Sequence, residues 1–273
     1  MKSAKLRKVL LIFLAAILTL TAAGCGSAQT GDNRRDDSLQ KILDAGQLVL
    51  GLDTEFPPMG FIDESGEIVG FDIDVAQEVC DRLGIALVKK GIDWDTKEED
   101  LDKGNIDCIW NGMSVTPARA EAMNLSEPYM KNEVIVVVLG SSDIEGLRDL
   151  AGRKVGVQSG STAQEVLETS DRVKDISVVT YDDNMELLNK LELGETDAAL
   201  VDSVVAYHFI FSSDKKYYIL PDSLGEEEYA IGFRKGDQAL RDRVQEILSE
   251  MKGDGTLGDI SKKWFGSDIT TVR

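Results

Sequence analysis

Histidine and cysteine are scarce in this chain of 273 residues, which has one histidine and three cysteines. His208 has no second histidine with which to share a metal ion or a proton, and it lies in the apolar stretch VVAYHFIF. We therefore interpret it as a structural residue. No Ser-His-Asp, Cys-His or clustered metal-ligand pattern is present. The sequence thus predicts no metal site and no cofactor, and it disfavours enzymes that need either.

Basic side chains are also few, since 30 Lys and Arg stand against 49 Asp and Glu, a formal net charge of −19. Such an excess of negative charge repels polyanions. We therefore expect no binding of nucleic acid, and anionic membrane surfaces are poor partners for the same reason. Most of the acidic residues are interpreted as a solvated surface.

Two of the three cysteines fall within predicted regular structure. Cys80 lies in a predicted helix and Cys108 in a predicted strand, both with apolar neighbours. This setting favours buried free thiols. A disulfide between them stays open as an alternative, because an exported protein meets an oxidising environment.

Only the N-terminus carries a long uninterrupted apolar run. Four basic residues precede the run at 9–20, and the small residues AAGC (22–25) follow it. This order is typical of an export signal, here expected over 1–24, rather than of a transmembrane helix. Cys25 stands where bacterial lipoproteins carry their lipid, and the match resembles their lipobox; an ordinary secretory signal is the alternative. Residues 25–38 are polar and predict a flexible tether.

From residue 39 onward, short apolar strands alternate with amphipathic helices. LVLGL (48–52) and ALVKK (86–90) predict strands, and FDIDVAQEVCDRLG (71–84) predicts a helix between them. Thr96 and Glu99 have the spacing of a capping box that opens the next helix. Alternation of this kind indicates an α/β architecture with mainly parallel sheets.

One pattern occurs twice. LDKGNIDCIW (101–110) and LELGETDAAL (191–200) share Leu, Gly and Asp at identical spacing. In each, a helix is expected to end near the glycine and an apolar strand to begin at the aspartate. We infer two lobes built alike. Because ligands of open α/β sheets bind beyond the carboxyl ends of the strands, the residues after these two strands become candidates.

A cation follows the first of these strands in an unfavourable place. Thr116 predicts a helix N-cap and Pro117 the first helical position, which puts Arg119 in the first turn. A positive charge there opposes the helix dipole by roughly 0.3–1 kcal/mol. After the second strand, Asp202 supplies an anion. A positive and a negative group at two strand ends are what a zwitterion requires.

A third segment predicts a site for an anion. KVGVQSGSTAQEVLE (154–168) has the order strand, glycine-containing turn and helix, with Ser161 as N-cap and Gln164 three residues later. Backbone N–H groups at such a helix terminus bind anions, and without a P-loop lysine a carboxylate suits it better than a triphosphate. A capping box with no ligand is the alternative.

These segments together resemble a known family, the polar amino-acid solute-binding proteins of ABC importers (family 3, type II periplasmic-binding-protein fold). The resemblance covers nearly all of residues 39–266 through seven segments in order: GLDTEFPPMGF (51–61), GEIVGFDIDVAQEV (66–79), DCIWNGMSVTPAR (107–119), SEPYM (126–130), KVGVQSGST (154–162), DAALVDS (197–203) and GDGTLGDISKKWFG (253–266). It implies an α/β protein of two lobes, with two mixed, mainly parallel sheets, flanking helices and a ligand cleft between the lobes. The implied organisation is 39–135 for the first part of lobe 1, 136–230 for lobe 2 and 231–273 for the segment that returns to lobe 1.

The resemblance also assigns roles in binding the backbone of an amino acid. Arg119 would pair with the α-carboxylate through two parallel hydrogen bonds. From the other lobe, Ser161 and Thr162 would bind the same carboxylate. Asp202 would accept the α-ammonium. The residues expected to assist it are Ser114 and the backbone near Asn111 and Gly112.

For the ligand side chain the resemblance is less specific. Phe56 would form one wall by stacking, whereas Trp94 and Trp110 are each either pocket or core. Asp53 touches the side chain or shapes its loop, as does the neighbouring Glu55. Gln158 stands where the family varies with specificity and favours a polar ligand. Glutamine, arginine, histidine, cystine and acidic amino acids remain open.

The implied partners are an ABC permease and its ATPase, which would receive the amino acid from a closed, monomeric binding protein. The expected location is outside the cytoplasm, held to a bacterial membrane by lipid on Cys25. Two other functions remain open: a dehydratase-like enzyme on the same scaffold, and an amino-acid-sensing adaptor. No acid or base stands out for elimination, so we expect a binding protein and not an enzyme.

Overall fold

The computed structural model describes residues 36–273, so the expected export signal, Cys25 and most of the expected tether lie outside the described residues. Ser38, which we placed at the end of the tether, is instead the first residue of helix α2 (Ser38–Ala45) and is buried. Its hydroxyl accepts a hydrogen bond of 3.1 Å from the backbone N–H of Leu240. The folded part therefore begins before residue 39.

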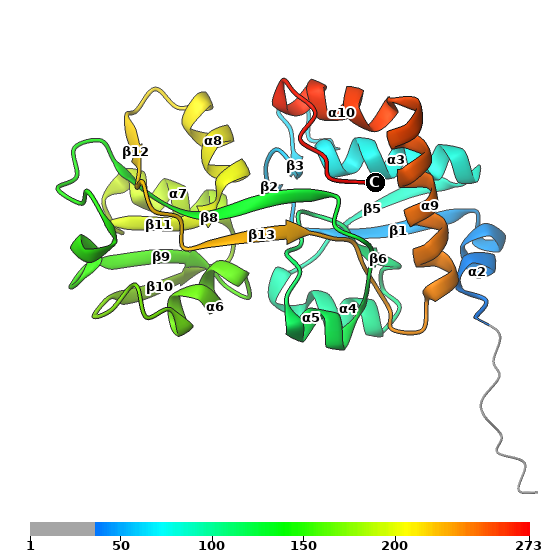
Figure 1. Ribbon diagram of the computed structural model, residues 1–273, viewed down its shortest axis with the longest axis horizontal. Coiled ribbons are helices and arrows are strands. Elements are labelled where there is room, and N and C mark those ends of the chain that lie inside the picture. Colours follow the sequence, from blue (N-terminus) through cyan, green and yellow to red (C-terminus); the bar gives the residue numbers. More distant parts are fainter. Residues whose placement is uncertain (1–35) are drawn as a thin grey trace, which may run out of the picture. The chain divides into compact units, whose positions relative to one another are not determined.

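The first sheet has the strand order β5-β1-β6-β14-β7 and forms the centre of the part that we call lobe 1 (Figure 1). Its strands are β1 (Gln47–Leu52), β5 (Ala86–Gly91), β6 (Cys108–Ile109), β7 (Asn124–Leu125) and β14 (Gly232–Phe233). Around it lie α2, the small sheet β2 (Glu55–Phe56), β3 (Gly60–Ile62) and β4 (Ile68–Val69), the 3₁₀ turn η1 (Trp94–Thr96), and the helices α3 (Phe71–Leu83), α4 (Lys97–Asp102), α5 (Pro117–Ala122), α9 (Gln238–Asp254) and α10 (Thr256–Phe265).

The second sheet has the order β10-β9-β11-β8-β12, with β13 also paired to β8, and forms the centre of lobe 2. Its strands are β8 (Met130–Leu139), β9 (Lys154–Gln158), β10 (Ser177–Tyr181), β11 (Ala198–Asp202), β12 (Tyr217–Ile219) and β13 (Gly225–Tyr229). Its helices are the 3₁₀ turn η2 (Leu147–Leu150), α6 (Thr162–Thr169), α7 (Asn184–Leu193) and α8 (Ser203–Ser212).

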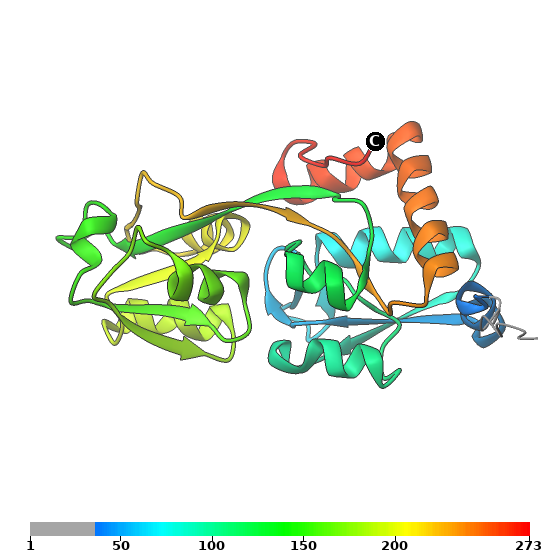
Figure 2. The ribbon, with the colours of Figure 1, turned by 60° about the horizontal axis from the view of Figure 1, so that its bottom comes forward.

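Two neighbouring strands, β8 and β13, run antiparallel between the lobes, as Figures 1 and 2 show. One expected lobe boundary, 135/136, lies within β8. The other, 230/231, lies just after β13 and before β14. After β14 the chain stays with lobe 1, where α9 packs against α2 and α3. Both sheets are mixed, as expected, but parallel pairings do not predominate: the two sheets have four parallel strand pairings. Five pairings are antiparallel, because β8, β12, β13 and β14 all pair in that direction.

The pattern that occurs twice in the sequence has the same structure in both lobes. Gly104 and Gly194 take left-handed φ angles of 74° and 71° after their helices. The carboxylate of Asp107 then accepts a 2.9 Å hydrogen bond from the N–H of Val49 on β1, and that of Asp197 accepts one of 2.7 Å from the N–H of Lys154 on β9. Each aspartate thus joins the start of the strand that follows it, β6 or β11, to the neighbouring parallel strand, β1 or β9. The prediction of similarly built lobes is confirmed here.

Two local predictions come out differently. Thr96 precedes α4 but its side chain caps nothing, so the predicted capping box is wrong; Asp93, three residues earlier, accepts from the N–H of Asp95 at 2.9 Å and caps η1 instead. Cys80 and Cys108 are both free and buried, which confirms the thiol interpretation and removes the disulfide. Burial raises the pKa of the Cys80 thiol to about 12.

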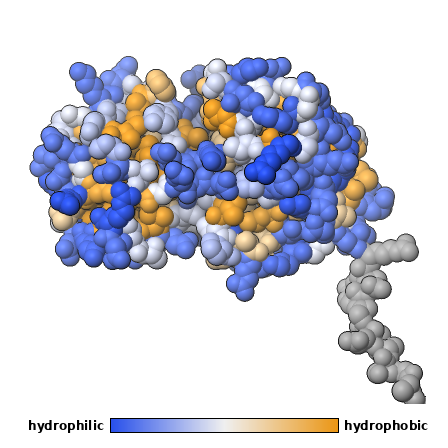
Figure 3. Space-filling view, viewed as in Figure 1, coloured by the Kyte–Doolittle hydropathy of each residue, from blue (hydrophilic) through white to orange (hydrophobic). Residues whose placement is uncertain are grey.

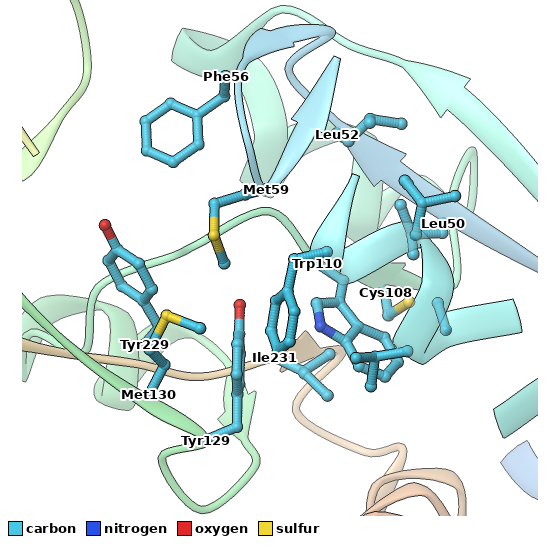
Figure 4. Packing of buried hydrophobic residues seen from close by; sticks show 14 of the residues in the cluster. Leu50, Leu52, Phe56, Met59, Cys108, Trp110, Tyr129, Met130, Tyr229 and Ile231 are labelled. Atoms are coloured by element: carbon cyan, nitrogen blue, oxygen red, sulfur yellow. The ribbon is translucent and has the colours of Figure 1, made fainter. Parts of the chain in front are cut away.

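The core of lobe 1 reaches the first residues of β8. Trp110 is fully buried there beside Tyr129 and Ile231, and Tyr129 in turn packs against Tyr229 (Figure 4). Of the two alternatives for Trp110, the structure therefore shows core. Hydrophilic residues cover much of the face drawn in Figure 3, in keeping with the acidic composition.

Candidate ligand-binding site

A cavity lies between the two lobes, at the carboxyl ends of strands from both sheets. Its volume is about 20 Å³, which is room for little more than one water molecule. Eleven of the residues that the sequence proposed for ligand binding line it: Asp53, Phe56, Trp94, Asn111, Gly112, Ser114, Arg119, Gln158, Ser161, Thr162 and Asp202. The structure thus brings all of them together in a narrow, closed cleft, while their contact with a ligand stays a prediction.

Arg119 in the first turn of α5 is 8% exposed. Thr116 caps this helix as predicted, accepting a 3.1 Å hydrogen bond from the N–H of Arg119. The guanidinium donates to the carbonyl of Ser114 through Nη1 at 2.8 Å and to that of Gly160 through Nη2 at 3.5 Å. Burial lowers its pKa, although the charges of Glu98, Glu227 and Asp202 oppose that shift.

No carboxylate within residues 36–273 forms a salt bridge with this guanidinium. A buried cation with only carbonyl partners is costly, and an anion that accepts two of its N–H groups offsets that cost. An ion pair with a protein acid would also explain the position of Arg119, but no such pair exists in the described part of the chain. The free positive charge faces the cleft cavity.

The N-terminus of α6 supplies the opposite wall from lobe 2. Ser161 caps the helix by accepting from the N–H of Gln164 at 3.2 Å, as the sequence predicted. The hydroxyl of the buried Thr162 donates to the hydroxyl of Ser114 in lobe 1 at 3.3 Å. Arg119 and the positive end of α6 thus meet across the cleft, which concentrates binding capacity for an anion.

Asp202, at the end of β11, marks a second, negative corner. The hydroxyl of Tyr229 donates to it at 2.9 Å, and Nδ2 of Asn132 donates to its other oxygen at 2.9 Å. Desolvation, together with the negative charge of Glu227, raises the pKa of Asp202 well above its ordinary value despite these two hydrogen bonds. A cation placed here would restore the ionised carboxylate.

A third corner is also acidic. Asp53 follows β1 and is 7% exposed; its carboxylate accepts from the N–H of Glu55 at 2.8 Å and from Nε2 of Gln158 at 2.7 Å. Burial raises the pKa of Asp53, and the charges of Asp183 and Asp93 add to this. No lysine or arginine within residues 36–273 forms a salt bridge with it. Glu55 itself is exposed and is not part of the cavity lining.

The aromatic and glycine residues shape the cleft. Phe56 and Trp94 are 6% and 8% exposed and both line the cavity, so Trp94 belongs to the pocket rather than to the core alone. Gly112 has a φ of +58°, and a Cβ on it would stand 2.9 Å from the ring of Phe56. Its N–H donates to the fully buried Asp72 at 2.7 Å, which fixes this turn against the core of lobe 1.

Three further lining residues were not predicted: Ala163, Asn184 and Val201. Asn184 follows β10, a strand parallel to β9, so its position at the same sheet edge was foreseeable once β10 was placed. Its Nδ2 donates to Oε1 of Gln158 at 2.7 Å and orients that amide toward Asp53. Within residues 36–273 the structure has no cluster of potential metal ligands and no helix with the length and apolar character to cross a membrane.

Residues 48–267 match the bacterial extracellular solute-binding proteins, family 3. The chain belongs to this family. This solute-binding protein is 31% identical to the L-cystine-binding protein TcyJ of Escherichia coli over 85% of its own length and 87% of the relative's. It is 30% identical to the arginine-binding extracellular protein ArtP of Bacillus subtilis, covering 95% and 98% of the two chains. Among solved structures, an ABC uptake transporter substrate-binding protein from Streptococcus pneumoniae with bound histidine matches with a TM-score of 0.83 and 36% identity, over 87% of this chain and 99% of that one.

Family membership confirms three expectations drawn from the resemblance. The fold is the two-lobed α/β fold of these binding proteins, the protein acts outside the cytoplasm, and its relatives are binding proteins rather than enzymes. The relatives differ in the amino acid that their names give. The choice of ligand therefore has to be argued from the cleft of this protein itself.

Proposed function

We propose that this solute-binding protein captures a cationic L-amino acid, with L-arginine as the best fit, and delivers it to an ABC permease and ATPase. The charge pattern of the cleft carries the proposal. The buried cation Arg119 has no acid partner within residues 36–273, while the carboxylates of Asp202 and Asp53 lie in two separate corners of the cleft. An amino acid with a cationic side chain has one negative and two positive groups in that arrangement.

Each ligand group has a matching protein group. The α-carboxylate would accept from Arg119 and from the N-terminus of α6, and the α-ammonium would donate to Asp202. The side chain would lie between Phe56 and Trp94, where an arginine guanidinium gains stacking and cation–π attraction. Its end would reach Asp53, whose buried carboxylate has no cation of its own in the described part of the chain.

The narrowness of the cleft supports a binding cycle with two states. Room for little more than a water molecule means that a ligand enters only while the lobes are apart. Contacts from both lobes then favour closure, since a ligand shifts such an equilibrium only by binding one state better. The permease would recognise the closed state, and lipid on Cys25 would hold the protein near it.

Thermal unfolding of the purified protein with single amino acids tests this proposal. L-arginine, L-lysine and L-ornithine are expected to raise the unfolding temperature, by an amount that corresponds to about 4 kcal/mol at a concentration a thousand times the dissociation constant. L-glutamine and L-histidine are expected to stabilise less, and L-glutamate not at all. Stabilisation by L-glutamate or L-cystine alone would contradict the cationic assignment.

A further inference from the structure

Glu227 is a second carboxylate at the negative corner, one that the sequence analysis did not identify. It lies on β13, one of the two strands that run between the lobes, opposite Asn132 of β8. Glu227 lines a neighbouring cavity of about 740 Å³ and not the cleft itself. Nδ2 of Asn132 donates to Asp202 at 2.9 Å and to Glu227 at 3.0 Å. The two carboxyl groups therefore share one donor and lie side by side.

The surroundings hold this pair in place. Oδ1 of Asn132 accepts from the N–H of Ser203 at 3.1 Å and from its hydroxyl at 2.9 Å, which fixes the amide so that its donor faces the acids. The hydroxyl of Ser114 donates to Glu227 at 2.9 Å. Neither carboxylate forms a salt bridge within residues 36–273. Two carboxylates that share one donor in a partly buried site repel each other, and without a cation between them this repulsion favours a shared proton.

The charged groups around the pair do not supply that cation. Arg119 faces it from α5, but its donors are directed at the carbonyls of Ser114 and Gly160. The hydroxyl of Tyr229 reaches Asp202 from β13. Lys131 and three glutamates line the cavity beyond Glu227: Glu133, Glu226 and Glu228. Burial raises the pKa of Asp202, and the negative charge of Glu227 adds to that shift.

We propose that Glu227 makes ligand capture proton-coupled: the empty Asp202–Glu227 pair holds one proton, which the α-ammonium of the amino acid displaces into solvent. One positive charge leaves as the proton goes to buffer, and one arrives with the ammonium, so the charge of the site is conserved. Glu227 acts through Asp202 and is a positioning residue. The inference rests on the proposed function, because it needs an amino acid with its ammonium at Asp202.

Isothermal titration calorimetry at pH 6, in two buffers of different ionisation enthalpy, measures the protons released. L-arginine and L-glutamine serve as probes, since both carry a fully protonated α-ammonium at this pH. Lys97, whose pKa of about 8 lies closest to neutrality among the basic groups near Arg119, stays charged at pH 6 and contributes nothing. For the native protein we expect release of about one proton per amino acid bound, and an affinity that rises by up to tenfold per pH unit while the pair stays protonated.

The variant Glu227→Gln keeps the shape and the contacts to Ser114 and Asn132 but removes one charge. It is expected to bind the same probes with proton release near zero and a flat pH profile. Glu226→Gln, on the same strand but exposed, is the matched control and should release protons as the native protein does.

Two outcomes separate this inference from the proposed function. Binding of either probe by the native protein without proton release, or undiminished release by Glu227→Gln, overturns the proton coupling and leaves ligand binding intact. If the native protein binds neither probe nor any other amino acid, the proposed function itself fails, and this inference fails with it. The native-protein measurement decides the matter even if a variant does not fold.

Discussion

Gln158 of lobe 2 donates a hydrogen bond of 2.7 Å to the carboxylate of Asp53 in lobe 1. The bond joins the two lobes at the corner where the ligand side chain is proposed to end. Asn184 donates to the amide oxygen of Gln158 and so fixes that amide. The carboxylate of Asp53, which accepts from the same amide, is therefore held in one position. Asp53 should therefore determine which side chains the cleft accepts.

Asp53→Asn tests that role. The substitution removes the charge but keeps the size, so L-arginine is expected to bind about 10- to 100-fold more weakly, as for the loss of a charged hydrogen-bond partner. Affinity for L-glutamine should change by less than about threefold. Calorimetric titration measures both, and Glu55→Gln, exposed and outside the lining, serves as the control. An equal loss for the two ligands would show that Asp53 shapes the loop and does not select the side chain.

Gly160 provides a test of lobe closure. A Cβ at this residue would lie 2.3 Å from Oδ1 of Asp95 in the opposite lobe, and its φ is +64°. Gly160→Ala should weaken amino-acid binding by at least tenfold, because the closed state is obstructed. Gly152→Ala is the matched control: its φ of +78° gives the same backbone strain, but its Cβ would have nothing within 4 Å. If both variants lose affinity equally, strain in lobe 2 and not closure is responsible.

The buried Lys97 should make the stability of the protein depend on pH in the alkaline range. It is 3% exposed, donates to the carbonyl of Trp94 at 2.8 Å, and lies 4.9 Å from the centre of that ring. Burial, with the charge of Arg119, lowers its pKa to about 8. A lysine whose pKa is depressed by folding binds fewer protons in the native state, so stability rises with pH between about 8 and 10.5, by up to about 3 kcal/mol.

Lys97→Met should remove that rise. The difference in unfolding free energy between native protein and variant is measured by urea denaturation at pH 7.5 and 10. The unfolding free energy of the native protein should increase relative to that of the variant as the pH rises. A difference that does not change with pH would mean that Lys97 titrates normally.

Asp72 should affect the stability of the protein between acidic and neutral pH. It is fully buried behind Gly112, accepts from that N–H and from the hydroxyl of Tyr129, and has its pKa raised by burial to about 7. Folding then disfavours the ionised form, so its contribution to stability falls as the pH rises from about 4 to 7 and stays low above that.

Asp72→Asn should flatten this fall, with an upper limit of about 4 kcal/mol for a shift of three pKa units. Unfolding by urea at pH 5 and pH 8, with the native protein beside the variant, measures the change. An identical pH dependence in the two proteins would contradict a raised pKa at Asp72.

The cleft residues that could be predicted are those with local signals. Arg119 lies at the disfavoured end of a helix, Ser161 caps a helix, and Asp202 ends an apolar strand. The neighbouring residues in the sequence were therefore enough to predict their roles. Sheet topology then placed them at facing edges. The alternation of strands and helices predicted both lobes for the same reason.

The features that could not be predicted from the sequence depend mostly on contacts between distant segments. Glu227 meets Asp202 only through the register of β13 on β8, and no periodicity in GEEEY marks its middle glutamate. The capping box at Thr96 failed because Asp93 provides a competing cap nearby. Burial of Lys97 against the opposite lobe likewise has no signal in a charged segment such as KEEDLD.

In the proposed function, Arg119 binds the carboxylate of an amino acid between the closing lobes. The most direct test of this contact is calorimetric titration of the native protein and of Arg119→Lys with L-arginine and with L-argininamide, which lacks the carboxylate. We expect tight binding only for the native protein with L-arginine, and at least a hundredfold loss when either the guanidinium fork or the carboxylate is missing. Equal affinity of the native protein for the amide, or unchanged binding by Arg119→Lys, would show that Arg119 does not bind the ligand carboxylate.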